Sequence, residues 1–284
     1  MTRGMIFMLA AGLLFVLMDA CGKYLAERYP IIEVTWARYV FHVATLPFLA
    51  GKLDWFVFAR TRRLGLQLGR ATLMMATTLL FFLAVRHIPL ATATAIGFAA
   101  PLFLTALAVP LLGEHVGWRR WCAVIVGFLG TLAIIRPGLE VVHWATALPL
   151  ATALCYALYQ IATRKVGASD PWETTLFYTA APCALLSCLL VPFNWQWPSA
   201  FDWGVMVVMG LLGSLSHLAV IRAFTLTQAS ALAPFSYVQL VWAGIVGMVA
   251  FGDVPGWWDL LGAIIIVGSG LYVFHREKIS RPRA

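Results

Sequence analysis

Apolar runs of about 20 residues recur along the whole chain, separated by short segments that hold charged residues, proline or glycine. A helix of this length crosses the hydrocarbon core of a bilayer, which is about 30 Å thick. Cutting the chain at its polar segments predicts ten spans. They cover approximately residues 5–25, 31–51, 65–86, 90–112, 118–135, 145–165, 172–192, 203–222, 230–251 and 256–275. The pattern therefore predicts an all-α polytopic membrane protein with ten transmembrane helices.

Composition supports this prediction and excludes an ordinary soluble domain. Of 284 residues, 62% are hydrophobic and only 11% are charged, whereas soluble domains carry about 25% charged residues. The mean hydropathy is +0.86. Ten spans leave no room for an appended soluble domain. The net charge of +8 does not indicate a nucleic-acid partner, because the basic residues fall mainly in the predicted loops and the C-terminal tail.

The basic residues are divided unequally between the two sides of the predicted membrane. With a cytoplasmic N-terminus, fourteen lysines and arginines lie inside and four lie outside, and Arg38 and Arg70 fall within spans. The positive-inside rule then places both termini in the cytoplasm. We therefore expect a multi-pass protein of the inner (plasma) membrane. The basic C-terminal tail, residues 275–283, is expected to contact anionic lipid headgroups.

The two halves of the chain repeat each other. Residues 113–118 match residues 252–257 at an offset of 139, as in the pair Gly113-Glu114 and Gly252-Asp253. Residues 18–23 fall on 159–164 at an offset of 141, and 33–35 fall on 173–175 at 140. We predict two units, residues 1–137 and 138–284, each with five spans. Because five is odd, the second unit must enter the membrane with inverted orientation, as in many secondary transporters.

These repeated features resemble the drug/metabolite transporter superfamily, and within it the ten-span proteins built from two EamA-type repeats. The resemblance is carried by small residues, a helix with proline or aromatic residues, a Gly-Glu or Gly-Asp turn, a tryptophan and a glycine-rich last span, at 84–130 and again at 223–270. It covers nearly the whole chain. It implies an exporter or exchanger of small metabolites with a central cavity between the repeats, similar to bacterial exporters of amino acids.

Catalytic, metal-binding and phosphate-binding motifs are absent from the sequence, so neither a cofactor nor a metal is expected. The segment from Ser214 to His217 places hydroxyls and an imidazole within one helical turn, as a nucleophile and its base require. A membrane-embedded hydrolase or transferase is therefore one alternative. The competing interpretation is helix packing, where small polar residues are common.

Asp19 is the one carboxylate well inside a predicted span, where an unpaired charge is costly. It lies fourteen residues after Met5, about 21 Å along the helix, which suggests a gating or coupling position in the outer third of the membrane. The alternative is an ion pair with Lys23, four residues further on. Gln160, the repeat equivalent of Asp19, would lie in the inner third. Glu114 and Asp253 are expected to be structural turn residues.

Two prolines, Pro101 and Pro234, interrupt spans four and nine and predict bends that face a central substrate path. Aromatic residues beside these bends suggest a cavity for solutes with an apolar body. The repeat offset pairs Phe98 with Tyr237 and Thr78 with His217. The expected cavity residues are Phe15, Thr78, Phe81, Phe82, Phe98, Pro101, Tyr156, Tyr159, His217, Pro234, Tyr237 and Trp242. Helix packing is the competing interpretation of each aromatic residue.

These features predict a secondary transporter that exports a small-molecule substrate, with amino acids as the leading class, by alternating access between the repeats. An alternative is proton-coupled efflux of hydrophobic cations through Asp19. Arg38 is interpreted as reaching the outer surface by snorkelling, and His42, four residues on, is a candidate proton relay. The sequence leaves the substrate, the coupling ion, the direction of flux and the oligomeric state open.

Overall fold

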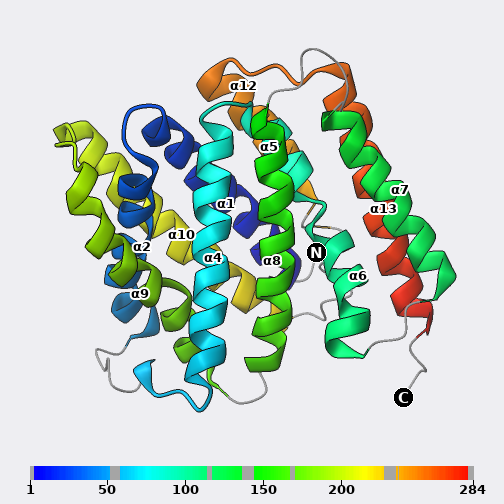
Figure 1. Ribbon diagram of the computed structural model, residues 1–284, viewed down its shortest axis with the longest axis horizontal. Coiled ribbons are helices and arrows are strands. Elements are labelled where there is room, and N and C mark those ends of the chain that lie inside the picture. Colours follow the sequence, from blue (N-terminus) through cyan, green and yellow to red (C-terminus); the bar gives the residue numbers. More distant parts are fainter. Residues whose placement is uncertain are drawn as a thin grey trace.

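The computed structural model (Figure 1) describes residues 3–51, 58–113, 117–135, 144–166, 170–226, 235 and 237–280. The fold is all-helical, as predicted. The first half contains α1 (Arg3–Ala26), α2 (Ile31–Ala50), α4 (Leu64–Val85), α5 (Leu90–Gly97), α6 (Ala100–Leu112) and α7 (Trp118–Ile135). The second half contains α8 (Ala147–Val166), α9 (Trp172–Leu190), α10 (Ala200–Leu226), α12 (Val238–Phe251) and α13 (Trp257–Ser280). Short 3-10 turns at Trp144–Thr146 and Val191–Asn194 accompany them.

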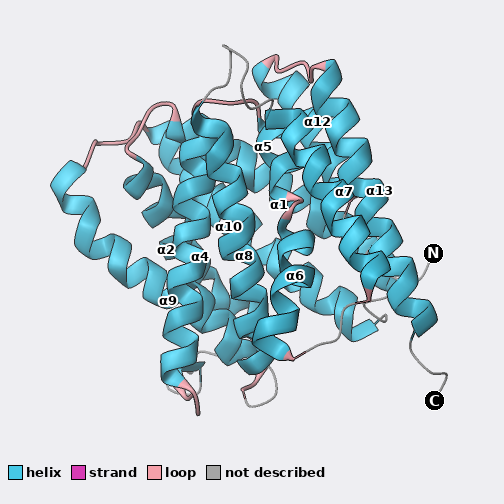
Figure 2. Cartoon of the chain, turned by 45° about the vertical axis from the view of Figure 1, so that its right-hand side comes forward, coloured by secondary structure: helices cyan, strands magenta, loops and turns pink. Residues whose placement is uncertain are grey.

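Every predicted span overlaps at least one of these helices, and Figure 2 shows them packed together as a bundle. Within the described residues, six helical stretches are long and apolar enough to cross a membrane by themselves, and three shorter apolar helices accompany them. The protein is therefore a multi-pass membrane protein. Large hydrophobic side chains such as Leu185, Phe193 and Val249 are well exposed, which fits a surface solvated by lipid.

Span four is divided into two helices. α5 ends at Gly97 and α6 begins at Ala100, so the break lies at Phe98 and Ala99. Pro101 is the second residue of α6, in the first turn of a helix, where a missing N–H is tolerated. Span four is therefore interrupted, and the interruption lies just before the proline.

Equivalent positions of the two halves adopt the same backbone conformation. Gly113 follows α6 with a φ of 67°, and Gly252 follows α12 with a φ of 70°, a left-handed conformation that glycine adopts without steric cost. The prolines at 30 and 171 precede α2 and α9 in the same way. The repeat seen in the sequence thus sets helix boundaries in both halves.

The most extensive helix packing joins the first half to the second. α1 lies along α10 and α4 lies along α8, while α2 packs on α9 and α7 packs on α13. Figure 1 shows the pair α4 and α8 near the centre and the pair α7 and α13 at the right. At one close approach, a Cβ added at Gly210 of α10 would lie 2.2 Å from the Cβ of Phe41 on α2. The two halves therefore share one core.

Candidate functional site

Four ionisable side chains gather where α1, α2 and α10 meet, and we call them the central polar cluster. They are Asp19 on α1, Arg38 and His42 on α2, and His217 on α10. The side chain of Arg38 is close enough for its charge to act on the other three. Because these groups lie within apolar helices, a charge on any of them is costly unless it meets a partner or a solute.

Arg38 is 8% exposed, and in the described part of the chain its guanidinium forms no hydrogen bond or ion pair. Its Cζ lies 5.6 Å from the ring centroids of both Phe82 and Tyr39. Cation–π contact at this distance compensates only part of the lost hydration. The structure thus corrects the snorkelling interpretation, because Arg38 is buried among helices.

Asp19 is also 8% exposed, and its carboxylate has no hydrogen bond or ion pair among the described residues. Lys23 pairs instead with Asp253, with 2.5 Å between Nζ and Oδ2, and its Nζ lies 4.6 Å from the ring centroid of Phe251. The same Asp253 oxygen is 3.4 Å from the backbone N of Leu90. Asp253 therefore connects α1, the start of α5 and the turn between α12 and α13, while Asp19 is left without Lys23.

The two histidines extend the cluster toward α10. Their ring centroids are 5.6 Å apart, and Phe15 packs edge-on against His217 at 5.1 Å. His42 is 3% exposed, and its Nε2 has no hydrogen-bond partner in the described residues. The Ser214 hydroxyl contacts Thr45 and the carbonyl oxygens of His42 and Gly210. Since Ser214 is bonded within this packing rather than to His217, the segment is not arranged as a nucleophile and its base.

Aromatic residues of α4 and α8 lie beside the cluster. A Cβ added at Gly22 of α1 would be 2.3 Å from the Phe82 ring, so Phe82 packs directly against the helix that carries Asp19. Tyr156 and Tyr159 stack with ring centroids 5.7 Å apart. Tyr156 is 37% exposed, and it is close enough to Arg38 for the guanidinium charge to act on its hydroxyl. This tyrosine is therefore partly exposed on α8.

Arg70 on α4 has a different environment from Arg38. It is 0% exposed, and it donates to Gln67 at 3.2 and 3.0 Å and to the hydroxyls of Tyr159 at 3.1 Å and Thr163 at 3.4 Å. It also donates to the carbonyl oxygen of Thr175. These bonds join α4, α8 and α9, so the Arg70 side chain is part of the helix packing.

Other residues predicted for the cavity lie away from the central polar cluster. Phe98 and Tyr237 contact each other with ring centroids 5.3 Å apart, but Phe98 packs in a hydrophobic core with Ile134 and Ile266. A Cβ added at Gly270 of α13 would lie 1.6 Å from the Tyr237 hydroxyl oxygen. This pair therefore contacts α7 and α13.

The remaining residues singled out from the sequence have structural contacts or lie outside the described residues. Thr78 forms a 2.6 Å hydrogen bond with Tyr39. Phe81 and Trp242 pack on the main hydrophobic core, and the Trp242 Nε1 finds no partner in the part of the chain that the structure covers. Gln160 is half-buried on α8. Pro234, Glu114 and residues 281–283 of the basic tail lie outside the described residues.

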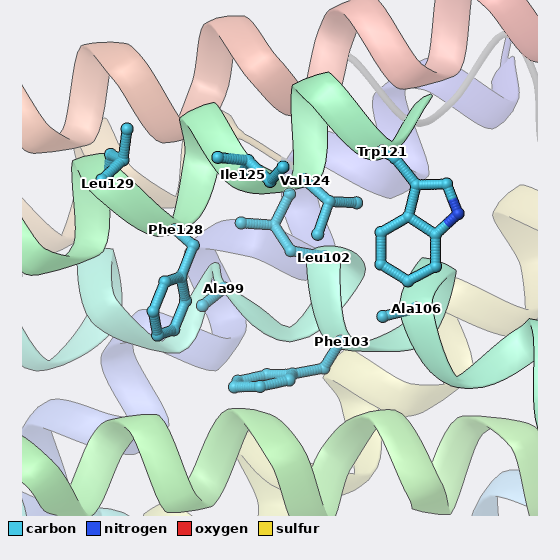
Figure 3. A pocket seen from close by; sticks show the side chains of 9 residues that line it. All are labelled: Ala99, Leu102, Phe103, Ala106, Trp121, Val124, Ile125, Phe128 and Leu129. Carbon is cyan, nitrogen blue, oxygen red and sulfur yellow. The ribbon is translucent and has the colours of Figure 1, made fainter. Parts of the chain in front are cut away.

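An apolar cavity of about 240 Å³ lies between α6 and α7 (Figure 3). Its lining is hydrophobic throughout and consists of Ala99, Leu102, Phe103, Ala106, Trp121, Val124, Ile125, Phe128 and Leu129. The indole nitrogen of Trp121 points away from this cavity, so no polar atom faces it and the cavity cannot orient a polar metabolite. The central polar cluster is therefore the better candidate for a binding site.

The sequence-based cavity omitted Arg38 and His42. The signal that could have found them is their depth, because Arg38 is the eighth residue of a 20-residue apolar helix. An ionisable residue at that depth indicates function more often than packing.

Helices that span a membrane, two interlocked repeats and a buried polar cluster between them define a class, the secondary transporters of small metabolites. The EamA-like transporter family model matches residues 2–136 and again residues 143–274. The chain belongs to the EamA-like transporter family, and it is not an enzyme.

Curated relatives span nearly the whole chain. An S-adenosylmethionine uptake transporter of Rickettsia felis is 30% identical over 268 residues, which cover 93% of this chain and 90% of the relative. A riboflavin transporter of Vibrio cholerae is 28% identical, covering 97% and 94%. A pseudopaline exporter of Pseudomonas aeruginosa is 24% identical, covering 97% of each. A solved crystal structure shares the fold with a TM-score of 0.67 at 16% identity, over 96% of this chain and 97% of that one.

Proposed function

We propose that this protein moves a metabolite that contains an amino-acid group across the inner membrane, by alternating access between two inverted repeats. S-adenosylmethionine is the first substrate to test, because it joins an amino-acid group to an aromatic base. The observation that carries the proposal is the central polar cluster, which buries a carboxylate and a guanidinium between helices of both halves. The relatives named for S-adenosylmethionine uptake support the choice of substrate.

The aromatic surroundings suit the apolar part of such a solute. Phe82 lies against Arg38, Phe15 contacts His217, and the stacked Tyr156 and Tyr159 border the cluster. Aromatic side chains stack on planar bases and contact cations through their ring faces. The repeat units 1–137 and 138–284, with both termini in the cytoplasm, form part of the proposal and rest on the repeat offsets and the distribution of basic residues.

The test is counterflow in proteoliposomes loaded with unlabelled S-adenosylmethionine and supplied outside with the labelled compound. This assay reports substrate identity for uptake and export alike. We expect exchange about tenfold above protein-free liposomes, with the label recovered chemically unchanged. Exchange of riboflavin without exchange of any amino-acid solute would contradict the proposal, because riboflavin has no charges for the cluster to bind.

Competition with a hydrophobic monocation tests the alternative of drug efflux in the same vesicles. The positive charge of Arg38 beside Asp19 disfavours a solute that carries positive charge alone. We therefore expect little competition from the monocation and strong competition from unlabelled S-adenosylmethionine.

A further inference from the structure

The acidic group of Asp19 and the basic group of Arg38 belong to the same polar cluster, yet among the described residues no salt bridge joins them. Both side chains are more than nine-tenths buried. Two opposite charges inside a membrane protein normally pair with each other, because each unpaired ion costs several kcal/mol. A buried ionisable group without a partner indicates a site for a group of the opposite charge.

The Phe82 ring contacts the helix that carries Asp19 and also lies near Arg38. The Phe82 ring packs against Gly22, one helical turn after Asp19, and the same ring lies 5.6 Å from the Cζ of Arg38. A side chain at position 22 would clash with Phe82, so this contact holds α1 and α4 at a fixed spacing. Lys23, which could have neutralised Asp19, is held by Asp253.

We propose that Asp19 and Arg38 form a clamp for a zwitterion, in which Arg38 binds the carboxylate of the solute and Asp19 binds the ammonium group on the same carbon. This inference rests on the proposed function and deepens it by naming the chemical class and the contacts. A guanidinium offers parallel N–H donors that match a carboxylate. An amino-acid group supplies both charges in one small unit, so that neither ion of the clamp stays unpaired when it is bound.

The clamp predicts discrimination between S-adenosylmethionine and its decarboxylated analogue. Wild-type protein should bind the carboxylated compound more tightly, by about 10- to 100-fold, the range of charge-assisted hydrogen bonds. In Arg38→Gln this ratio should fall to about threefold or less, because only the carboxylated compound loses a contact. Arg38→Lys should recover part of the ratio, since it keeps the charge without the planar fork.

The matching change on the other side is Asp19→Asn. It should weaken S-adenosylmethionine and its uncharged-sulfur thioether analogue by the same factor, about 10-fold or more, because both carry the ammonium group. Two exposed residues provide controls with the same change in charge, Arg86→Gln and Glu27→Gln. These variants should leave the dissociation constants of both compounds within about twofold of wild type. Binding is measured by thermal shift of the purified protein, alongside counterflow.

The outcomes separate the clamp from the transport proposal. If Arg38→Gln weakens the carboxylated and decarboxylated compounds equally, Arg38 acts through packing and the clamp is wrong, while transport of S-adenosylmethionine stands. If Asp19→Asn weakens only the sulfonium compound, the carboxylate binds the sulfonium and the clamp as stated is also wrong. A wild-type protein that exchanges riboflavin and neither binds nor exchanges a zwitterion overturns both proposals.

Discussion

Arg38 and Arg70 are both buried in transmembrane helices, but their surroundings differ in kind. Arg70 donates hydrogen bonds to side chains and a carbonyl oxygen on α4, α8 and α9. The Cζ of Arg38 lies 5.6 Å from the centroids of two aromatic rings, and its guanidinium has no hydrogen bond in the described residues. Burial alone therefore does not distinguish a structural arginine from a functional one. What distinguishes them is whether the guanidinium N–H groups donate hydrogen bonds within the protein.

The largest effect is expected at Arg70. Arg70→Met should lower the free energy of unfolding by about 3–5 kcal/mol, because it leaves Gln67 and the Thr175 carbonyl oxygen without their charged donor. Arg70→Lys should restore only part of this loss, since an ammonium cannot reach three helices at once. Thermal unfolding in detergent measures both variants. If Arg70→Met has the melting temperature of the wild type, Arg70 does not stabilise the helix packing.

An intermediate effect is expected at the pair of Lys23 and Asp253. Its side chains are 7% and 20% exposed, so breaking the pair with Lys23→Met should cost about 1–3 kcal/mol, less than for a fully buried pair. The exchanged double variant Lys23→Asp with Asp253→Lys should recover part of the loss. A double-mutant cycle without coupling between the two positions would show that the contact does not stabilise the fold.

The smallest effect on stability is expected at Arg38. Arg38→Gln should leave the free energy of unfolding unchanged or raise it by up to about 1 kcal/mol, because it removes a buried charge that has no partner. The same variant should lose transport. Destabilisation as large as that of Arg70→Met would mean that Arg38 has structural partners, and the two arginines would then belong to one class.

Most of the fold could be predicted from the sequence because a bilayer restricts the possibilities. Each predicted span overlaps a helix, and the matched turns at Gly113 and Gly252 share a left-handed conformation that the repeat anticipates. The exact position of the break in span four could not be predicted, since a proline marks a helix start as readily as a bend. The structure places Pro101 at such a start.

The candidate site was harder to predict, because an apolar helix gives no periodic signal for the face that points inward. Asp19 and His217 were named from their chemistry, and they lie in the central polar cluster. Phe98 and Tyr237 were paired by the repeat offset, and they do contact each other, but beside α7 and α13. The partner of Lys23 is 230 positions away in the sequence. Helical spacing suggested Asp19 instead, because it reports only local neighbours.

The unequal shares of the two repeats in the cluster have an evolutionary consequence. Adding the repeat offsets places Gln160 at the position of Asp19, as 19 + 141, and Tyr178 at that of Arg38, as 38 + 140. The Tyr178 hydroxyl donates to the Ala59 carbonyl oxygen at 2.8 Å. The first half thus supplies the acidic and the basic group, while the equivalent positions of the second half carry an uncharged amide and a tyrosine that bonds to the first half. Selectivity in such a protein can diverge through substitutions in one half, without disturbing the interlocked packing that both halves inherited.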